Sequence, residues 1–161
     1  MSTATKTTFS PKTLASKDAI TQLRADHVKV SRLFAEYEKA RTTARKKALV
    51  ADICTELTVH AQIEEEIFYP EVKAALKDHL LVPEAKVEHA SLKDLIAQIE
   101  AVEPDGDMYD AKVKVLSEYV KHHVKEEQDE MFPKVKASSL DLLELGTRMA
   151  ARKATLLVMR G

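Results

Sequence analysis

The chain has 161 residues, with 3 Gly, 5 Pro, no Trp, 5% aromatic residues and 45% hydrophobic residues. Sandwiches and barrels need frequent turn residues and many β-branched and aromatic side chains, so this composition argues against an all-β fold and for helices. Lys and Arg number 25 against 26 Asp and Glu, and the net charge of −1 argues against the basic surface that nucleic-acid binding requires.

Residues 1–16 are rich in Ser, Thr and Lys, and we expect a flexible N-terminal tail there. From Lys17 onward, apolar residues recur at alternating spacings of three and four, which is typical of helices. The pattern predicts helices over about 17–41, from 44 into the seventies, over 82–103 and over 108–136. Four amphipathic helices with short connections predict an all-α fold, an antiparallel up-down four-helix bundle over residues 17–137.

An additional C-terminal helix is predicted over about 139–158, within the segment 138–161, with Ser138 or Ser139 as its N-cap. We expect it to pack on the bundle or on a partner subunit, in which case it would form a homodimer. The chain has one cysteine, Cys54, which suits a reducing compartment, and no apolar stretch long enough to span a membrane. These features favour a cytoplasmic protein without membrane or nucleic-acid partners.

The chain also contains an internal repeat. The pair Asp26-His27 is matched 62 residues later by Glu88-His89. The residues His60, Glu64 and Pro70 are matched 63 residues later by His123, Glu127 and Pro133. The two helical hairpins therefore look like copies of one unit, and such a repeat predicts a site with pseudo-twofold symmetry on the bundle axis.

Six polar residues occupy positions that the helical periodicity assigns to the core: His27, His60, Glu64, His89, His123 and Glu127. A buried carboxylate without a partner costs several kcal/mol, so something must compensate this group. In each copy a His and a Glu stand four residues apart, hence on one helix face. Imidazole and carboxylate together suit iron, manganese or zinc. The pattern predicts a dinuclear metal site with four His and two Glu ligands.

Helix lengths agree with this arrangement, because within each hairpin the ligands lie about 14–16 residues from the turn, a rise of roughly 21–24 Å. The link from Glu64 to His89 fits less well, since the two sides of that turn differ in length. An interior proline removes a hydrogen bond and kinks a helix. We therefore predict that the second helix bends or breaks near Pro70.

Neighbouring residues receive structural interpretations. His79 and His122 fall off the core positions and are expected at the surface, and Cys54 is expected to pack in the core. Asp26 and Glu88 could accept hydrogen bonds from imidazoles, but adjacent helix residues point about 100° apart, which favours solvated or inter-helix salt-bridge roles. Glu65 and Glu126 flank the predicted ligands and are weaker alternatives to them. Apolar core packing is expected for three aromatic residues: Phe68, Tyr69 and Phe132.

The motifs at 23–27, 60–70, 87–89, 123–127 and 131–133 resemble those of the hemerythrin-like family, which carries a His-His-Glu (HHE) cation-binding domain. The resemblance covers about residues 17–137. It implies a non-haem centre of two iron ions with bridging carboxylates from Glu64 and Glu127. It also implies His27 and His60 on one iron and His89 and His123 on the other, with zinc or manganese as alternative occupants.

The sequence departs from the oxygen-carrying hemerythrins in two places. Their third helix carries a further imidazole where this chain has Ala85, which leaves room for water or another small ligand. Their spacing in the last helix would select His122, whereas the internal repeat favours His123.

The resemblance implies a protein that binds or responds to dioxygen, nitric oxide or peroxide. Two alternatives stay open. The first is an enzyme that decomposes peroxide or nitric oxide, or an iron donor for cluster repair. The second is a structural bundle whose polar residues are satisfied by zinc or by internal hydrogen bonds.

Overall fold

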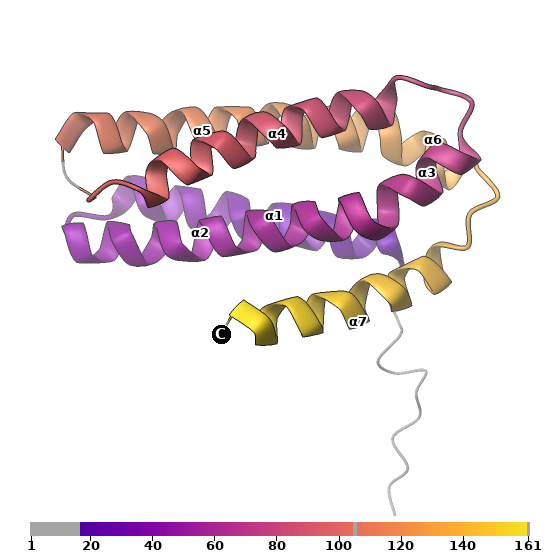
Figure 1. The fold of residues 1–161 in the computed structure, drawn as a ribbon, viewed down its shortest axis with the longest axis horizontal. Coiled ribbons are helices and arrows are strands. Elements are labelled where there is room, and N and C mark those ends of the chain that lie inside the picture. The colour runs from indigo at the N-terminus through magenta and orange to yellow at the C-terminus, as the bar shows by residue number, and fades with distance from the viewer. Residues whose placement is uncertain (1–16, 105, 161) are drawn as a thin grey trace, which may run out of the picture.

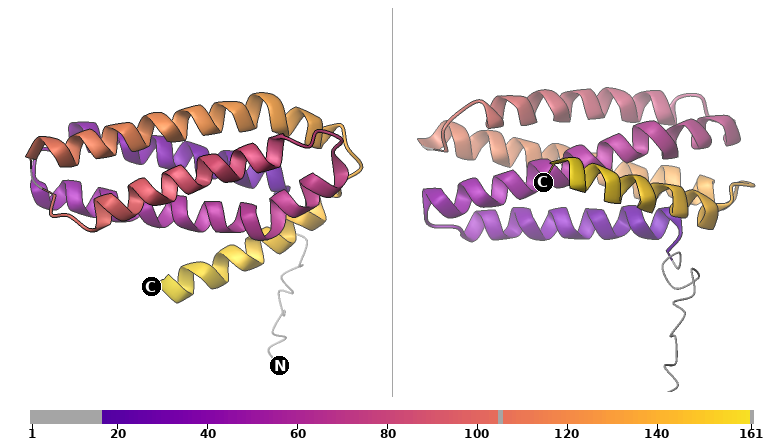
Figure 2. Two further views of the ribbon diagram at one scale, coloured as in Figure 1. Left: turned by 45° about the horizontal axis from the view of Figure 1, so that its top comes forward. Right: turned by 60° about the horizontal axis from the view of Figure 1, so that its bottom comes forward.

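A computed structural model describes residues 17–104 and 106–160, so the predicted tail at 1–16 lies outside the described part. The regular structure in these residues is helical, which confirms the all-α prediction. Two layers of long helices lie face to face, one made of α1 and α2 and the other of α4 and α5, while α7 lies against the first layer (Figures 1 and 2). The elements are α1 (Ala19–Lys39), α2 (Thr43–Ile63), α3 (Tyr69–Ala75), α4 (Leu81–Glu100), α5 (Gly106–Glu126), α6 (Phe132–Lys136) and α7 (Leu142–Arg160).

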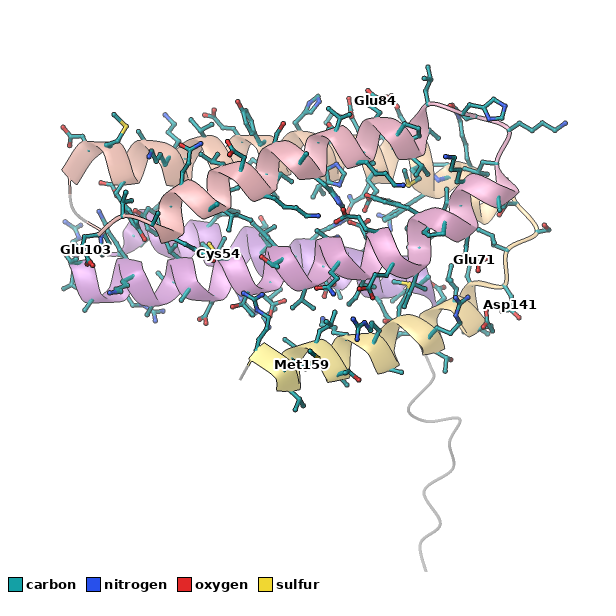
Figure 3. All side chains as sticks on the ribbon, in the orientation of Figure 1. Cys54, Glu71, Glu84, Glu103, Asp141 and Met159 are labelled. Atoms are coloured by element: carbon teal, nitrogen blue, oxygen red, sulfur yellow. The ribbon has the colours of Figure 1, made fainter. Side chains whose placement is uncertain are left out.

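Short polar side chains fix where helices begin. Asp18 caps α1 by accepting a hydrogen bond of 2.8 Å from the Thr21 amide. The last helix begins at Leu142, where the Asp141 carboxylate accepts from the Glu144 amide at 3.1 Å (Figure 3). The predicted cap at Ser138 or Ser139 is therefore wrong, since the Ser138 hydroxyl instead accepts from the Leu140 amide within the preceding turn. Sequence spacing alone could not choose between these neighbouring caps.

Two π-helical turns interrupt the second and fourth long helices, at Glu64–Phe68 and Glu127–Met131. Each is followed by a proline, Pro70 or Pro133, whose ring nitrogen cannot donate the hydrogen bond of a regular helix. The predicted interruption near Pro70 is confirmed, and an equivalent one occurs before Pro133, where the sequence pattern had predicted an unbroken helix. The internal repeat thus extends to the path of the backbone.

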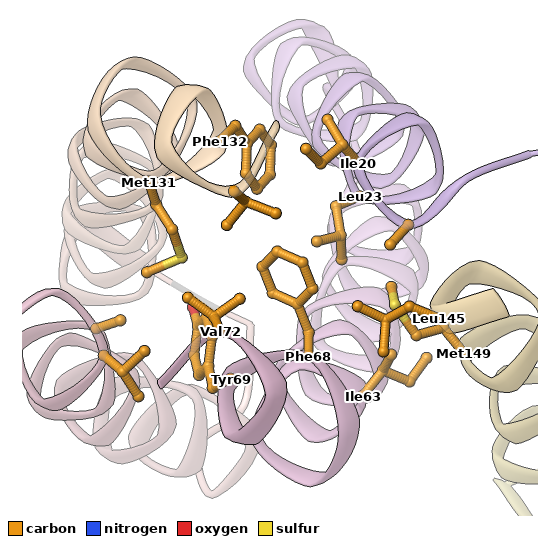
Figure 4. Packing of buried hydrophobic residues seen from close by; sticks show 14 of the residues in the cluster. Ile20, Leu23, Ile63, Phe68, Tyr69, Val72, Met131, Phe132, Leu145 and Met149 are labelled. Atoms are coloured by element: carbon orange, nitrogen blue, oxygen red, sulfur yellow. The ribbon is translucent and has the colours of Figure 1, made fainter. Parts of the chain in front are cut away.

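Two apolar clusters fill the interior, and along the long helices the predicted ligands fall between them. One cluster contains Leu23, Tyr69 and Phe132 and is closed on one side by α7 through Leu145 and Met149 (Figure 4). The other holds apolar residues of α1, α2, α4 and α5 and includes Cys54. Burial and the nearby Glu100 carboxylate raise the pKa of the Cys54 thiol to about 12, which agrees with its expected packing role.

The N-terminal part of α7 approaches the start of α1 closely at Gly146. The side-chain amide of Gln22 donates to the carbonyls of both Gly146, at 2.7 Å, and Lys17, at 2.9 Å. A Cβ at position 146 would lie 2.5 Å from the Lys17 carbonyl oxygen, which is backbone and cannot rotate away. Glycine is therefore needed at position 146 because the two helices approach closely there, and not because of an unusual backbone conformation.

No helix of residues 17–104 and 106–160 has the length and apolar character to cross a bilayer.

Replacing Gly146 with alanine should lower the free energy of unfolding by about 1–3 kcal/mol, the usual cost of overpacking. Urea denaturation followed by circular dichroism would measure this. The matched control is Thr147→Ala, at an exposed position of the same turn, which should change stability by less than about 0.5 kcal/mol. Equal stability of the two variants would contradict the close approach.

Candidate metal centre

The structure brings all six predicted ligands to one place, midway along the bundle. Each of the four long helices contributes one imidazole, and each π-helical turn contributes one carboxylate. Exposed fractions range from 0% to 9%, for His27, His60, Glu64, His89, His123 and Glu127. A π-helical turn holds one more residue than an α-helical turn, and such turns occur often at functional sites.

The ligand atoms form two sets. His27, His60 and Glu127 offer atoms that all lie within 4.8 Å of one another, and so do Glu64, His89 and His123. The carboxylates also reach across: Glu64 Oε1 lies 3.0 Å from the Nε2 of His60, and Glu127 Oε2 lies 3.4 Å from the Nε2 of His123. Each carboxylate therefore contacts both sets.

Each of the four imidazoles points Nε2 toward the centre and Nδ1 toward an oxygen acceptor outside it. In each hairpin, a carboxylate on one helix accepts from the imidazole of the paired helix at 2.9 Å: Asp26 from His60, and Glu88 from His123. Because a carboxylate can only accept, Nδ1 carries a hydrogen, so in the neutral ring Nε2 has the lone pair that a metal ion needs.

The other two imidazoles face side chains of the opposite hairpin. The Oε1 of Gln128 accepts from His27 Nδ1 at 2.8 Å, whereas Glu65 Oε2 lies 3.4 Å from His89 Nδ1 without a hydrogen bond. The four side chains form two pairs at equivalent positions of the repeat: Asp26 with Glu88, and Glu65 with Gln128. For Asp26 and Glu88 the sequence favoured solvated or inter-helix salt-bridge roles, and their contacts are of the inter-helix kind: Asp26 with His60 and Lys153, and Glu88 with His123. The sequence did not identify the imidazole of the paired helix as the partner.

Several atoms that face the centre lack hydrogen-bond partners among residues 17–104 and 106–160. They are His27 Nε2, His60 Nε2, both carboxylate oxygens of Glu64, and Glu127 Oε1. Buried polar groups in proteins are almost always paired, so a cluster of inward-facing lone pairs calls for a cation. These residues therefore fit a metal pair.

The carboxylates dominate the electrostatics of the group. Burial alone would lower the pKa of His60, but Glu64 and Asp26 together raise it well above the usual range. Burial likewise opposes protonation of His123, yet Glu127, Glu64 and Glu88 raise its pKa to about 9. The neighbouring imidazoles hold the pKa of Glu64 well below its ordinary value against the effect of burial. Without metal, the negative centre thus attracts protons; with metal, the same charge stabilises the ions.

Stability of the metal-free protein should consequently fall as the pH rises. A base with a pKa higher in the folded than in the unfolded chain stabilises the fold while protonated; for His123 this contribution is complete below pH 6.5 and disappears through about pH 9. We expect the urea midpoint of metal-free protein to decrease over this range. The metal-loaded protein should not follow, because metal ions displace these protons. A metal-free midpoint that increases would contradict the assignment.

Tyr69 contacts the centre through its hydroxyl, which the expectation of apolar core packing did not include. Its ring packs in the apolar cluster as expected, but its hydroxyl donates to Glu127 Oε2 at 2.7 Å and lies 3.3 Å from His89 Nε2. Burial and the two carboxylates, Glu64 and Glu127, raise its pKa well above the usual range, so it stays a phenol. The repeat offers the signal that could have found it, since the equivalent residue is Phe132, which has no hydroxyl.

The other two histidines lie away from the centre. His79 is exposed in the segment between α3 and α4. The side chain of His122 is 67% exposed and faces Glu88 and Glu126 on the outer surface, whereas His123 is buried with Nε2 3.1 Å from that of His89. Of the two alternatives from the sequence, the structure thus brings His123 to the other ligands.

Comparisons with known proteins agree with this geometry. A crystal structure of a hemerythrin HHE cation binding domain-containing protein, the Rv2633c homologue of Mycobacterium kansasii, is similar with a TM-score of 0.76 and 25% identity over 87% of each chain. The protein Rv2633c of Mycobacterium tuberculosis is 27% identical over 110 residues, 66% of each chain. A DNA nickase of a Nostoc species is 30% identical over 114 residues, which are 71% of this chain but 32% of that protein.

This chain therefore spans about a third of the Nostoc protein and just under two thirds of the mycobacterial one. The sequence profile of the Hemerythrin HHE cation binding domain covers residues 18–135, which include the four buried histidines and two buried glutamates of the centre. The chain belongs to the hemerythrin HHE cation-binding domain family.

Proposed function

We propose that this protein is an antiparallel four-helix bundle that holds two non-haem iron ions and binds or responds to dioxygen, nitric oxide or peroxide. His27 and His60 would hold one ion, and His89 and His123 the other. Glu64 and Glu127 would bridge them. The observation that carries the proposal is two groups of inward-facing imidazole and carboxylate atoms, several of which have no hydrogen-bond partner among the described residues. Iron supplies redox chemistry and a coordination position for a small molecule; zinc or manganese would suit the same ligands.

The residues around the centre support a small ligand. A cavity of about 40 Å³ lies beside the histidines, large enough for a diatomic molecule or peroxide, since one water needs about 10–15 Å³. Its wall is mostly apolar, with Val30, Leu57, Leu92, Ile96, Val120 and Val124. Apolar walls exclude bulk water from the ligands. The Tyr69 hydroxyl, held by Glu127, is a hydrogen-bond donor positioned among the second set of ligand atoms.

The test is metal content combined with optical spectra. Protein reconstituted anaerobically with Fe²⁺ and then passed through gel filtration, which removes weakly bound metal, should hold two iron ions per chain. It should develop charge-transfer bands of an oxo-bridged pair on exposure to air. Fewer than one iron per chain and no such bands after reconstitution would overturn the proposal. High zinc content with a colourless spectrum would instead favour a structural bundle.

An enzyme is the second candidate, because the Tyr69 hydroxyl lies among the second set of ligand atoms, 3.3 Å from His89 Nε2, where it could form a hydrogen bond during turnover. In that case the loaded protein would consume peroxide or nitric oxide in large excess over its own concentration. A binding protein would take up no more than one equivalent per centre. An iron donor for cluster repair would release iron to an acceptor protein without turnover. DNA cleavage belongs to the name of the longer Nostoc relative, and the net charge of −1 here does not favour DNA binding.

A further inference from the structure

A third group of metal-ligand side chains lies on the outer face of α4 and α5, apart from the six buried residues. Glu88, His122 and Glu126 offer ligand atoms that all lie within 4.8 Å of one another. The Nε2 of His122 is 3.2 Å from Glu126 Oε1 and 3.5 Å from Glu88 Oε2. One imidazole with two carboxylates is a ligand set that suits a divalent transition-metal ion.

This outer group opens onto a pocket that leads to the buried centre. Glutamates dominate its lining, with Leu81, Glu84, Ala85, Glu88, His123, Glu126, Glu127, Glu130 and Met131 around about 20 Å³ of space. Its outer rim includes Glu84, on the first turn of α4 (Figure 3). At its inner end are His123 and Glu127. Glu127 is only 2% exposed, and its Oε1, which has no hydrogen-bond partner within the described ranges, lies in the buried centre, 3.4 Å from His27 Nε2. A cation is the partner that such a carboxylate requires.

Comparison of the two hairpins indicates what the outer group binds. In the first hairpin, Asp26 holds His60 with one oxygen, and its other oxygen accepts from the ammonium of Lys153 at 2.7 Å. In the second, Glu88 holds His123 with Oε1, while Oε2 faces the outer group. A cation bound at the outer group would contact Glu88 Oε2 in the same way as the ammonium of Lys153 contacts Asp26.

The other two residues of the outer group also differ from their counterparts in the first hairpin. Where the second hairpin has His122 and Glu126, the first has Val59 and Ile63, both buried in the apolar cluster that α7 completes. The corresponding face of the second hairpin has no helix over it in the described residues (Figure 2). Metal-ligand side chains therefore stand on the open face, and apolar ones on the covered face.

We propose that Glu88, His122 and Glu126 form a third cation site, where Fe²⁺ binds first and from which it passes along the glutamate-lined pocket to the buried ligands. The entry role rests on the proposed dinuclear centre, whereas the outer site itself does not. Three exposed or half-exposed ligands hold an ion more weakly than six buried ones, which a loading site requires. The carboxylates of the pocket concentrate cations at its mouth and leave Glu127 as the next ligand along the path.

Metal stoichiometry tests the site. In anaerobic equilibrium dialysis against Fe²⁺, the unchanged protein should bind three ions, one of them more weakly, and His122→Ala/Glu126→Gln should bind two. Glu88 is left intact because it holds His123. The matched control, His79→Ala/Glu118→Gln, removes the same groups from exposed positions and should bind three. Equal stoichiometry in the outer-site variant and the control would overturn the site.

Loading kinetics tests the route. Metal-free protein is mixed with a complex of Fe²⁺ and a coloured chelator. The absorbance of the complex then falls at the rate at which the protein takes up Fe²⁺. At low ionic strength, the outer-site variant should load at least about tenfold more slowly than the control, the size of effect expected of charged clefts. The difference should shrink at high salt. Equal loading rates of the outer-site variant and the control would overturn the entry route, even if the variant binds one ion fewer.

A buried-site variant separates this inference from the proposed function. Glu64→Ala/Glu127→Ala removes both proposed bridging ligands and leaves the outer group unchanged. It should keep one weakly bound Fe²⁺, and adding His122→Ala should abolish that binding. If the dinuclear proposal fails, this last ion still reports the outer site. Loss of all binding in Glu64→Ala/Glu127→Ala, with circular dichroism that shows a folded protein, would overturn the outer site.

Discussion

Glu127→Ala should lose most of its bound iron while remaining folded. The carboxylate contacts both ligand sets and accepts from Tyr69, so its removal takes a ligand from each proposed ion. Loss of a hydrogen-bond partner outside a metal site weakens binding by about 10–100-fold, and loss of a ligand shared by two ions should weaken it by more. Metal analysis after gel filtration, with circular dichroism for the fold, would measure this.

Two further variants make the test specific. His60→Ala should also lose metal, because its Nε2 faces the centre without another partner among the described residues. His79→Ala should retain as much iron after gel filtration as the unchanged protein, since His79 is exposed in a loop. If all three variants retain equal amounts of iron, the ligand assignment is wrong.

Phe132→Ala should destabilise the metal-free protein by about 3–5 kcal/mol, the usual cost of removing a buried phenyl ring. Phe132 is fully buried, its ring lies nearly parallel to that of His27 at 6.1 Å, and it meets the ring of Phe68 edge-on. Domains of this size are stable by about 5–15 kcal/mol, so the loss would be a large part of the total.

Chemical denaturation of metal-free protein isolates this effect from metal binding. Tyr119→Ala removes an aromatic ring from a half-exposed position of α5 and should change stability by less than about 1 kcal/mol. A similarly small effect for Phe132→Ala would mean that the apolar cluster beside the centre is not tightly packed.

Helical periodicity was sufficient to predict that the six buried His and Glu side chains lie in the core. His27 and His89 fall on core positions between apolar residues, and an imidazole there has few explanations besides a partner in the interior. The repeat added that the ligands of one hairpin must face those of the other. It also favoured His123 over His122, which agrees with where the structure places the two rings.

Helical periodicity and the internal repeat could not predict which side chains meet between different helices. The hydroxyl of Tyr69 enters the centre because the preceding π-helical turn redirects the chain, and no spacing rule gives the reach of a phenol across a bundle. Asp26 was judged against the histidine next to it in sequence, although its partner is on the paired helix. The beginning of α7 depended on a competition between adjacent polar caps, which is decided by tertiary packing.

The two hairpins differ at one pair of equivalent positions beside the centre, where the first has Tyr69 and the second has Phe132. The centre is therefore not symmetric. Duplication of one hairpin produces two halves that would treat both ends of a guest molecule alike. Here the phenol hydroxyl stands on one side, and on the other a benzene ring packs against His27. The Tyr69 hydroxyl already donates to Glu127, and neither ring lines the cavity beside the histidines, so the difference acts on the ligand residues themselves. The two proposed ions would therefore have chemically different surroundings.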